Sequence, residues 1–199
     1  METTHLLYLH GFRSSPSSAK AQKMARIMAC RYPGVTWYCP QLQPSPAQAM
    51  AQLMRHITAW PNEASFKSMA VVGSSLGGFY ATWVAAKMQC KAVLLNPAVC
   101  PARDLAKYIG EQTTWHNPNE AFFFKPEFID ELRALEAGPL TRGENYLAII
   151  AKGDEVLSWH EMSARYLGAK VKIIEGSDHA LSDFDQHLPE ILEFLNLAA

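Results

Sequence analysis

The chain has 199 residues, of which 49% are hydrophobic and 11% aromatic, and this supplies enough apolar material for the core of one domain spanning residues 1–199. Its 18 basic and 19 acidic residues nearly cancel and form no long run of one sign, so we expect neither a nucleic acid nor a membrane surface as partner. No segment reaches the roughly 18 apolar residues of a membrane span, and the first residues lack the basic region of a signal peptide, which predicts a cytoplasmic protein.

Short apolar runs alternate with amphipathic stretches along the chain, and this alternation is typical of a mostly parallel sheet covered by helices on both faces. Ser15 and Pro16 indicate the start of the first helix, with Ser15 as its cap. The pattern predicts a three-layer α/β/α sandwich with buried strands. In chain order, the expected strands are 6–9, 35–39, 69–72, 92–95, 146–150 and 171–174, and the helices are 17–32, 46–60, 76–88, 159–167 and 184–197.

The segment 98–145 breaks this regular pattern, because it is too long for a single crossover and rich in aromatic residues. We expect a small helical insertion there. Two interpretations stay open: a cap over a binding site, or an ordinary crossover whose extra helices pack on the core. The substrate-binding side chains are expected to lie in this segment, at Tyr108, Trp115, Phe122, Phe123 and Phe124.

A glycine-rich turn follows the strand predicted at 69–72 and precedes the helix predicted at 76–88. It reads Gly73-Ser74-Ser75-Leu76-Gly77, which fits the G-x-S-x-G nucleophile motif in its strand-to-helix context. Only Ser75 lies midway between Gly73 and Gly77, so it is the candidate nucleophile and Ser74 is its neighbour in the turn.

A serine hydroxyl needs a base to remove its proton, and His179 is the candidate. It lies in a polar loop directly after the last predicted strand, where a parallel sheet would bring it to the same edge as Ser75. Three other histidines are weaker candidates, because they fall in or near predicted helices, where surface or packing roles are expected: His56, His160 and His187.

The base needs an acid that fixes its tautomer, and Asp154 follows the strand predicted at 146–150. The chain order Ser75, Asp154, His179 is the order of α/β-hydrolase triads. Glu155 and Asp178 remain alternative acids. Asp178 is disfavoured because consecutive side chains in a loop usually diverge, and Glu155 because it lies one residue past the expected turn.

The oxyanion of an acyl-transfer intermediate is usually met by backbone N–H groups. Leu76, next to the nucleophile, is expected to supply one. Phe12 is expected to supply the other, because Gly11 lets the loop after the first strand bend close to the nucleophile. His10 is interpreted as a structural residue that holds this loop by hydrogen bonds.

Five stretches together give the chain a family resemblance over nearly its whole length. It resembles the α/β-hydrolase superfamily and, within it, the short bacterial esterases of the YqiA/YcfP type. The stretches are 10–16 (HGFRSSP), 73–81 (GSSLGGFYA), 95–98 (LNPA), 153–156 (GDEV) and 176–179 (GSDH).

The resemblance implies a six-stranded sheet in the spatial order 2-1-3-4-5-6 and hydrolysis of a carboxylester or thioester. It carries the catalytic triad onto Ser75, Asp154 and His179. The expected partner is a small-molecule acyl ester or acyl-thioester, and the reaction passes through an acyl-enzyme. Arg13 and Arg103 are interpreted as solvated charges, with an anionic handle on the substrate as the alternative role.

Three other questions stay open at this level. A binding module that keeps the fold without catalysis is one alternative function, and an acyltransferase or amidase using the same triad is another. A homo-oligomer is not excluded. The cysteines lack paired C-x-x-C spacing, so we expect no metal and no cofactor, although their even number leaves a disulfide open: Cys30, Cys39, Cys90 and Cys100.

Overall fold

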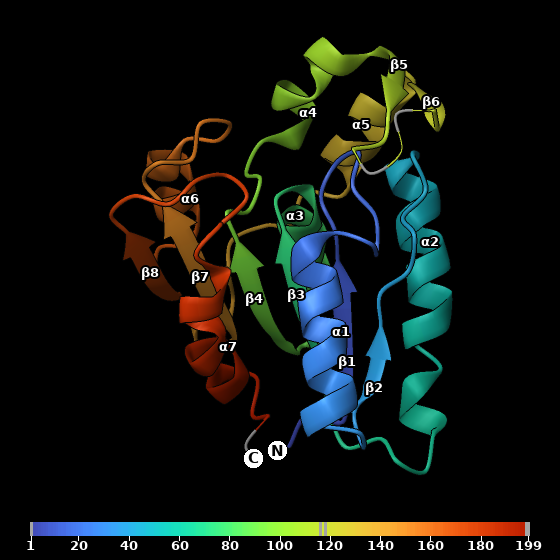
Figure 1. The fold of residues 1–199 in the computed structure, drawn as a ribbon. Helices are drawn as coiled ribbons and strands as arrows, with labels where there is room; N and C mark the ends of the chain where they lie inside the picture. Colours follow the sequence, from blue (N-terminus) through green and yellow to red (C-terminus); the bar gives the residue numbers. More distant parts are fainter. Residues whose placement is uncertain (1, 116, 118, 198–199) are drawn as a thin grey trace.

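A computed structural model describes residues 2–115, 117 and 119–197 (Figure 1). Within these residues, a six-stranded parallel sheet has the order β2-β1-β3-β4-β7-β8, and the predicted fold class is confirmed. The numbering departs from the expected 2-1-3-4-5-6 because two further strands, β5 and β6, intervene in the sequence and form a separate hairpin. The sheet strands are β1 His5–Leu9, β2 Thr36–Tyr38, β3 Met69–Ser74, β4 Lys91–Leu95, β7 Tyr146–Ala151 and β8 Lys170–Ile174.

The strands inside the sheet and those at its edges differ in burial. Every residue of β1, β3 and β7 is buried, because each has a neighbouring strand on both sides and helices on both faces. The expectation of full burial is wrong for β2 and β8, which lie at the two edges and are only partly covered. Alternate side chains of β1 point to opposite faces, with Leu6 and Tyr8 in one core cluster and Leu7 and Leu9 in the other.

Helices cover both faces of the sheet. Two of them, α1 Ala19–Arg31 and α7 Leu188–Phe194, pack on one face, and three pack on the other: α2 Pro46–Ile57, α3 Leu76–Met88 and α6 Trp159–Arg165. The predicted ends of two helices are 3₁₀ turns instead, at Trp60–Asn62 after α2 and at Phe184–His187 before α7.

The start predicted for α1 is wrong. The helix begins at Ala19 after Ser18, because Ser15 belongs to a separate turn. Its hydroxyl accepts a hydrogen bond from the Ser17 amide at 3.1 Å, and its carbonyl accepts one from the Ser18 amide at 3.1 Å. The serine-rich loop therefore continues three residues further than the sequence indicated.

The long segment between β4 and β7 is mixed rather than purely helical. It contains α4 Pro101–Asp104, the hairpin of β5 Gly110–Thr113 and β6 Ala121–Phe124, α5 Glu127–Ala134, and 3₁₀ turns at Ala106–Tyr108 and Gly143–Asn145. The hairpin is antiparallel and was not predicted. Figure 1 shows α4 and the hairpin beyond the carboxyl ends of the sheet strands.

The last helix of this segment belongs to the core. Leu132 of α5 is fully buried, in the cluster that also contains residues of α2 and α3. A carboxylate oxygen of Glu131 accepts hydrogen bonds from the Ser45 hydroxyl at 2.6 Å and from the Ala47 amide at 3.0 Å, which ties α5 to the start of α2. Each interpretation of 98–145 therefore describes one part of it. Helix α5 packs on the core, whereas α4 and the hairpin lie beyond the carboxyl ends of the sheet strands (Figure 1).

Candidate active site

Ser75 lies in a strained turn between β3 and α3. Its φ is +56° and its ψ is −122°, a combination that L-residues rarely adopt. A Cβ on Gly73 would lie 2.1 Å from the carbonyl oxygen of Gly77, and a Cβ on Gly77 would lie 2.0 Å from that of Leu9. Only glycine fits at both positions of the motif, because β1, β3 and α3 approach one another backbone to backbone there.

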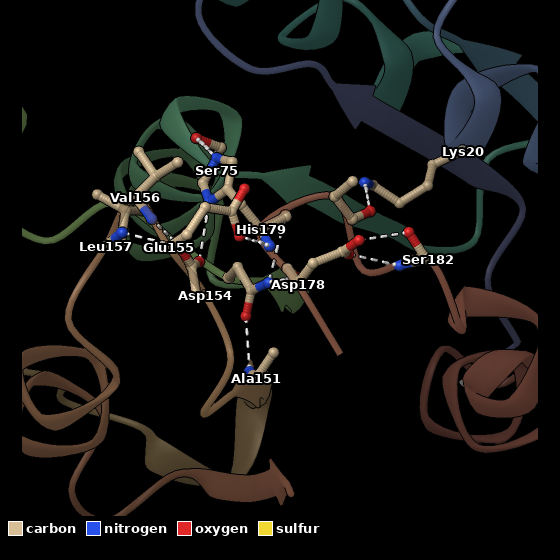
Figure 2. Close-up of polar contacts among 12 residues, drawn as sticks. Lys20, Ser75, Ala151, Asp154, Glu155, Val156, Leu157, Asp178, His179 and Ser182 are labelled. Atoms are coloured by element: carbon tan, nitrogen blue, oxygen red, sulfur yellow. Dashed lines mark hydrogen bonds and ion pairs between the residues drawn. The ribbon is translucent and has the colours of Figure 1, made fainter. Parts of the chain in front are cut away.

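A chain of hydrogen bonds runs from the Ser75 hydroxyl through His179 to Asp154 (Figure 2). Nε2 of His179 lies 3.0 Å from Oγ of Ser75, and its Nδ1 lies 2.8 Å from Oδ2 of Asp154. The Asp154 side chain is fully buried and the imidazole is 22% exposed. An ionised Asp154 can only accept, so Nδ1 carries the proton and Nε2 is left to accept from the serine hydroxyl.

The carboxylate of Asp154 is oriented by the backbone that follows it. Its Oδ1 accepts hydrogen bonds from the amides of Val156 and Leu157, each at 2.8 Å. This leaves Oδ2 directed at His179, as Figure 2 shows. The turn after β7 thus fixes both the position and the rotation of the carboxylate.

The two alternative acids make other contacts. Glu155 accepts a hydrogen bond from the backbone amide of His179 at 3.0 Å rather than from its ring. Asp178 accepts from the amide and hydroxyl of Ser182 at 2.9 and 2.6 Å, and these bonds hold the pKa of Asp178 below its ordinary value. Among the described residues, Asp154 is therefore the carboxylate that contacts the imidazole.

Asn96, directly after β4, is a site residue that the sequence analysis missed. It is fully buried, with φ +41°. Its Nδ2 donates to the carbonyls of Asp178 at 2.9 Å and His179 at 3.3 Å, and its Oδ1 accepts from the Ala151 amide at 2.8 Å. The available signal was a polar residue ending an apolar strand. Asn96 thereby holds the histidine loop against the end of β7.

The loop after β1 lies against the serine. A Cβ on Gly11 would lie 3.7 Å from Oγ of Ser75, so the backbone passes close to the nucleophile. Phe12 and Leu76 line the same cavity as Ser75, and within the described part of the chain no group accepts a hydrogen bond from either amide. Both amides are thus available to an oxyanion. Their role as an oxyanion hole remains a prediction.

The structural interpretation of His10 is confirmed. The ring is 3% exposed, its Nδ1 lies 3.0 Å from the Gly11 carbonyl oxygen, and its Nε2 accepts from the Leu42 amide at 3.1 Å. His10 therefore connects the loop after β1 to the loop that leads into α2.

A first cavity, of about 400 Å³, opens on Ser75 and His179 beneath the segment that connects β4 to β7. Of the predicted substrate-binding side chains, Tyr108 and Trp115 line it, and the Trp115 residue is 70% exposed. Its remaining wall is mostly apolar and includes Leu157. The structure thus brings two of the five predicted aromatic residues to the serine.

The other three aromatic residues lie elsewhere. The rings of Phe122 and Phe124 pack against that of Phe12, with centroids 6.1 and 5.2 Å away, and line a separate cavity of about 220 Å³. Phe123 is 53% exposed and lines neither cavity. Successive residues of β6 point to opposite faces of the hairpin, so Phe123 points away from Phe12 and the two cavities. The predicted contact between Phe123 and the substrate therefore has no support in the structure.

The two candidate arginines are already engaged within the protein. Nε of Arg13 donates to the Thr113 carbonyl at 2.6 Å, and its guanidinium stacks 4.2 Å from the centroid of the Trp115 ring. Arg103 donates to both carboxylate oxygens of Glu161 at 2.8 and 2.7 Å and to Asp104 at 2.7 Å. Arg13 therefore binds the β5–β6 hairpin to the loop after β1 rather than being a solvated charge. Arg103 is neutralised by the carboxylates of Glu161 and Asp104.

Several other candidate groups lie outside the serine site or form no site of their own among the described residues. His56 stacks on Tyr38, His160 stacks on Trp159, and His187 bonds to Asp183, so these rings lie outside the serine site. All four cysteines are free, which excludes the disulfide that their number left open. In the described part of the chain, no cluster of three or more His, Cys, Asp or Glu side chains is arranged for a metal ion. No helix there is long and apolar enough to cross a membrane.

Comparison with solved structures identifies the fold. One of the metagenome-derived lipolytic enzymes LipS and LipT is 18% identical with a TM-score of 0.67, over 100% of this chain and 96% of the other. Est1E from Butyrivibrio proteoclasticus is 14% identical with a TM-score of 0.67, over 98% and 86%. The Pyrococcus furiosus esterase Pf2001 is 13% identical with a TM-score of 0.68, over 98% and 82%. At these identities the likeness shows a shared fold.

The family model described as "Uncharacterised protein family (UPF0227)" matches residues 5–196. This match covers all strands of the sheet and every residue of the hydrogen-bonded chain at Ser75. The resemblance drawn from the sequence motifs is confirmed: the chain has the α/β-hydrolase fold and belongs to the uncharacterised protein family UPF0227.

Proposed function

We propose that the chain is a serine hydrolase that cleaves a small or medium acyl ester or thioester through an acyl-enzyme on Ser75. The observation that carries this proposal is the continuous hydrogen-bonded chain from Ser75 through His179 to the buried Asp154. The strained turn at Ser75 adds support, since a strained residue at the edge of a cavity is typical of a catalytic position.

Acylation begins when Oγ of Ser75 attacks the acyl carbon and its proton passes to Nε2 of His179. The carbonyl double bond opens, and the negative oxygen accepts hydrogen bonds from the amides of Phe12 and Leu76. Asp154 stays ionised and stabilises the imidazolium. The carbonyl then re-forms as the bond to the alcohol or thiol breaks, and Nε2 returns its proton to that leaving group.

Deacylation repeats the same steps with water. His179 takes a proton from the water molecule, the resulting hydroxide attacks the acyl carbon, and the same two amides meet the oxyanion. Collapse of this second intermediate expels the Ser75 oxygen, which recovers the proton from Nε2. The products are a carboxylic acid and the free enzyme.

The first cavity supports an apolar acyl group. Its volume of about 400 Å³ and its lining by Tyr108, Trp115 and Leu157 suit a short to medium acyl chain better than a polar one. The predicted substrate class therefore follows from the shape and chemistry of the wall next to the serine.

A fluorophosphonate probe tests the proposal, followed by peptide mapping and an assay with acyl esters and thioesters of increasing chain length. We expect labelling at Ser75, and a fall in turnover of roughly 10⁴-fold or more in Ser75→Ala. Ser74→Ala is the matched control, because it removes the adjacent hydroxyl and is expected to keep both labelling and turnover.

Three results would change the proposal. An unlabelled wild-type protein without turnover would favour the non-catalytic binding module. Faster product formation from an added alcohol than from water would favour an acyltransferase, and cleavage of matched amides in preference to esters would favour an amidase. Turnover retained in Ser75→Ala would overturn the assignment of the nucleophile.

A further inference from the structure

A second cavity, of about 560 Å³, opens on Ser75 and His179 from another direction. It lies between the loop after β1, the first turn of α1 and the loop that follows His179. Trp115, Ser75 and His179 line both this cavity and the first one, so the two cavities meet at the reacting hydroxyl. An ester bond held at Ser75 would therefore have one half in each cavity.

The second cavity contains a lysine, Lys20, whose ammonium group makes one hydrogen bond to a described residue. Nζ of Lys20 donates a hydrogen bond to the Ala180 carbonyl, as Figure 2 shows, and an ammonium group has two further donors. The other lysine of this lining, Lys23, forms an ion pair with Asp185. Within the described residues, Lys20 makes no ion pair.

The surroundings of Lys20 favour the arrival of a negative charge. Burial lowers the pKa of Lys20, and the nearby Asp178 charge opposes this shift only in part. A partly desolvated cation is stabilised when an anion binds beside it. Several serine hydroxyls also line the cavity, and those of Ser14 and Ser18 make no side-chain hydrogen bond to any described residue, so they are free to bind such an anion.

The first cavity has a different character. Its four charged side chains are each engaged by a neighbouring residue. Arg13 is bonded to Thr113 and stacked on Trp115, and Asp104 pairs with Arg103. Glu155 accepts a hydrogen bond from the His179 amide, and the ammonium group of Lys107 lies 5.2 Å from the centroid of the Tyr108 ring. The rest of the wall, with Tyr108 and Leu157, is mostly apolar. The two cavities therefore suit chemically different groups. The first suits a hydrocarbon, and the second suits a polar group with negative charge.

We propose that the second cavity binds the alcohol or thiol half of the substrate and that Lys20 recognises a negatively charged group on that half. This inference rests on the proposed hydrolysis at Ser75. The acyl half belongs in the first cavity, because Leu76, whose amide is expected to meet the oxyanion, lines that cavity and not the second. The leaving group then lies beside His179, whose following loop forms a wall of the second cavity and whose Nε2 supplies the proton.

A matched pair of thioesters tests the role of Lys20. S-butyryl 3-mercaptopropionic acid carries a carboxylate on its thiol half, and S-butyryl 3-mercaptopropanamide carries a neutral amide of nearly the same shape. We expect kcat/KM to be roughly tenfold or more higher for the acid, as a charge-assisted hydrogen bond supplies. Lys20→Gln is expected to remove this preference, whereas Lys20→Arg is expected to keep it. Lys67→Gln is the control, because Lys67 pairs with Glu2 and lines neither cavity, and it is expected to keep the preference as well.

The ratio of the two kcat/KM values separates recognition from a structural role. An equal loss for acid and amide in Lys20→Gln would overturn the inference, because loss of the contact with Ala180 alone would act on both substrates. A preference for charge on the acyl half, measured with monothioesters of glutaric and glutaramic acid, would also overturn it. Labelling and turnover at Ser75 without any preference for the acid would overturn this inference alone, whereas a protein that is neither labelled nor active would overturn the proposed function.

Discussion

Replacing Asp154 by asparagine tests the hydrogen-bonded chain without changing its shape. Oδ1 of Asp154 accepts from two backbone amides, of Val156 and Leu157, at 2.8 Å each. In Asp154→Asn the side-chain oxygen has to remain there, because an NH₂ group facing two N–H donors would leave three donors without an acceptor. The new NH₂ group is therefore forced toward Nδ1 of His179.

This orientation selects the wrong tautomer of His179. Nδ1 becomes an acceptor for the NH₂ group, so the ring proton moves to Nε2, which then faces Oγ of Ser75 as a donor and is unable to take its proton. We expect kcat to fall by roughly 10⁴-fold, the size of effect that a wrong tautomer produces in a triad. At about 1.36 kcal/mol per factor of ten, this corresponds to about 5.4 kcal/mol of lost transition-state stabilisation.

The measurement is kcat with a butyryl ester, beside urea unfolding curves that show the variant to be folded. Glu155→Gln is the matched control, because its side-chain oxygen still accepts from the His179 backbone amide, and we expect kcat within about threefold of wild type. Turnover of Asp154→Asn within tenfold of wild type would refute the argument from the two amides. An equally large loss in Glu155→Gln would transfer the acid role to Glu155.

Three further predictions concern stability. Asn96→Ala leaves buried partners of the asparagine without hydrogen bonds, so we expect urea unfolding to show a loss of about 2–4 kcal/mol, together with a lower kcat. Gly77→Ala places a Cβ 2.0 Å from the Leu9 carbonyl oxygen and is expected to yield little folded protein, whereas Gly138→Ala, with nothing within 4 Å, is expected to change the unfolding free energy by less than about 1 kcal/mol. The two lysines of β8 lower the pKa of Glu190, so its stabilising contribution is complete above its ordinary pKa of 4.5 and is lost as the pH falls through its lower folded value. Urea unfolding at a series of pH values is therefore expected to show that the free energy of unfolding falls less between neutral and acidic pH in Glu190→Gln than in wild type.

The parallel sheet was predictable because its strands are short apolar runs that local composition identifies. Each of the six expected strands is present, with ends that differ by at most two residues from the prediction, as at β3, which continues to Ser74. Edge and central strands could not be distinguished, since Val171 and Ile173 of β8 are as apolar as residues of β7, yet Ile173 is 42% exposed. That difference arises from the order of the strands in space, which a local pattern does not contain.

The segment 98–145 was the least predictable part of the fold. Three of its aromatic residues, Phe122–Phe124, are consecutive in sequence and were all predicted to contact the substrate. In the hairpin, alternation sends Phe122 and Phe124 to Phe12 and sends Phe123 outward. The run Phe122–Phe124 contains no signal that it is a strand rather than a helix, because three residues are too few to show a period.

The site was predictable to the extent that its residues follow strands. Asn96 shows that this rule also applies to a site residue that was not predicted. Ser75, Asn96, Asp154 and the loop of His179 follow β3, β4, β7 and β8, which are consecutive neighbours in the sheet. Parallel strands in register end at the same edge, so residues far apart in sequence meet there without any long-range signal. What the pattern could not supply is rotation of the side chains, which depends on backbone donors such as Val156 and on Asn96, and these contacts exist only once the four strand ends are assembled.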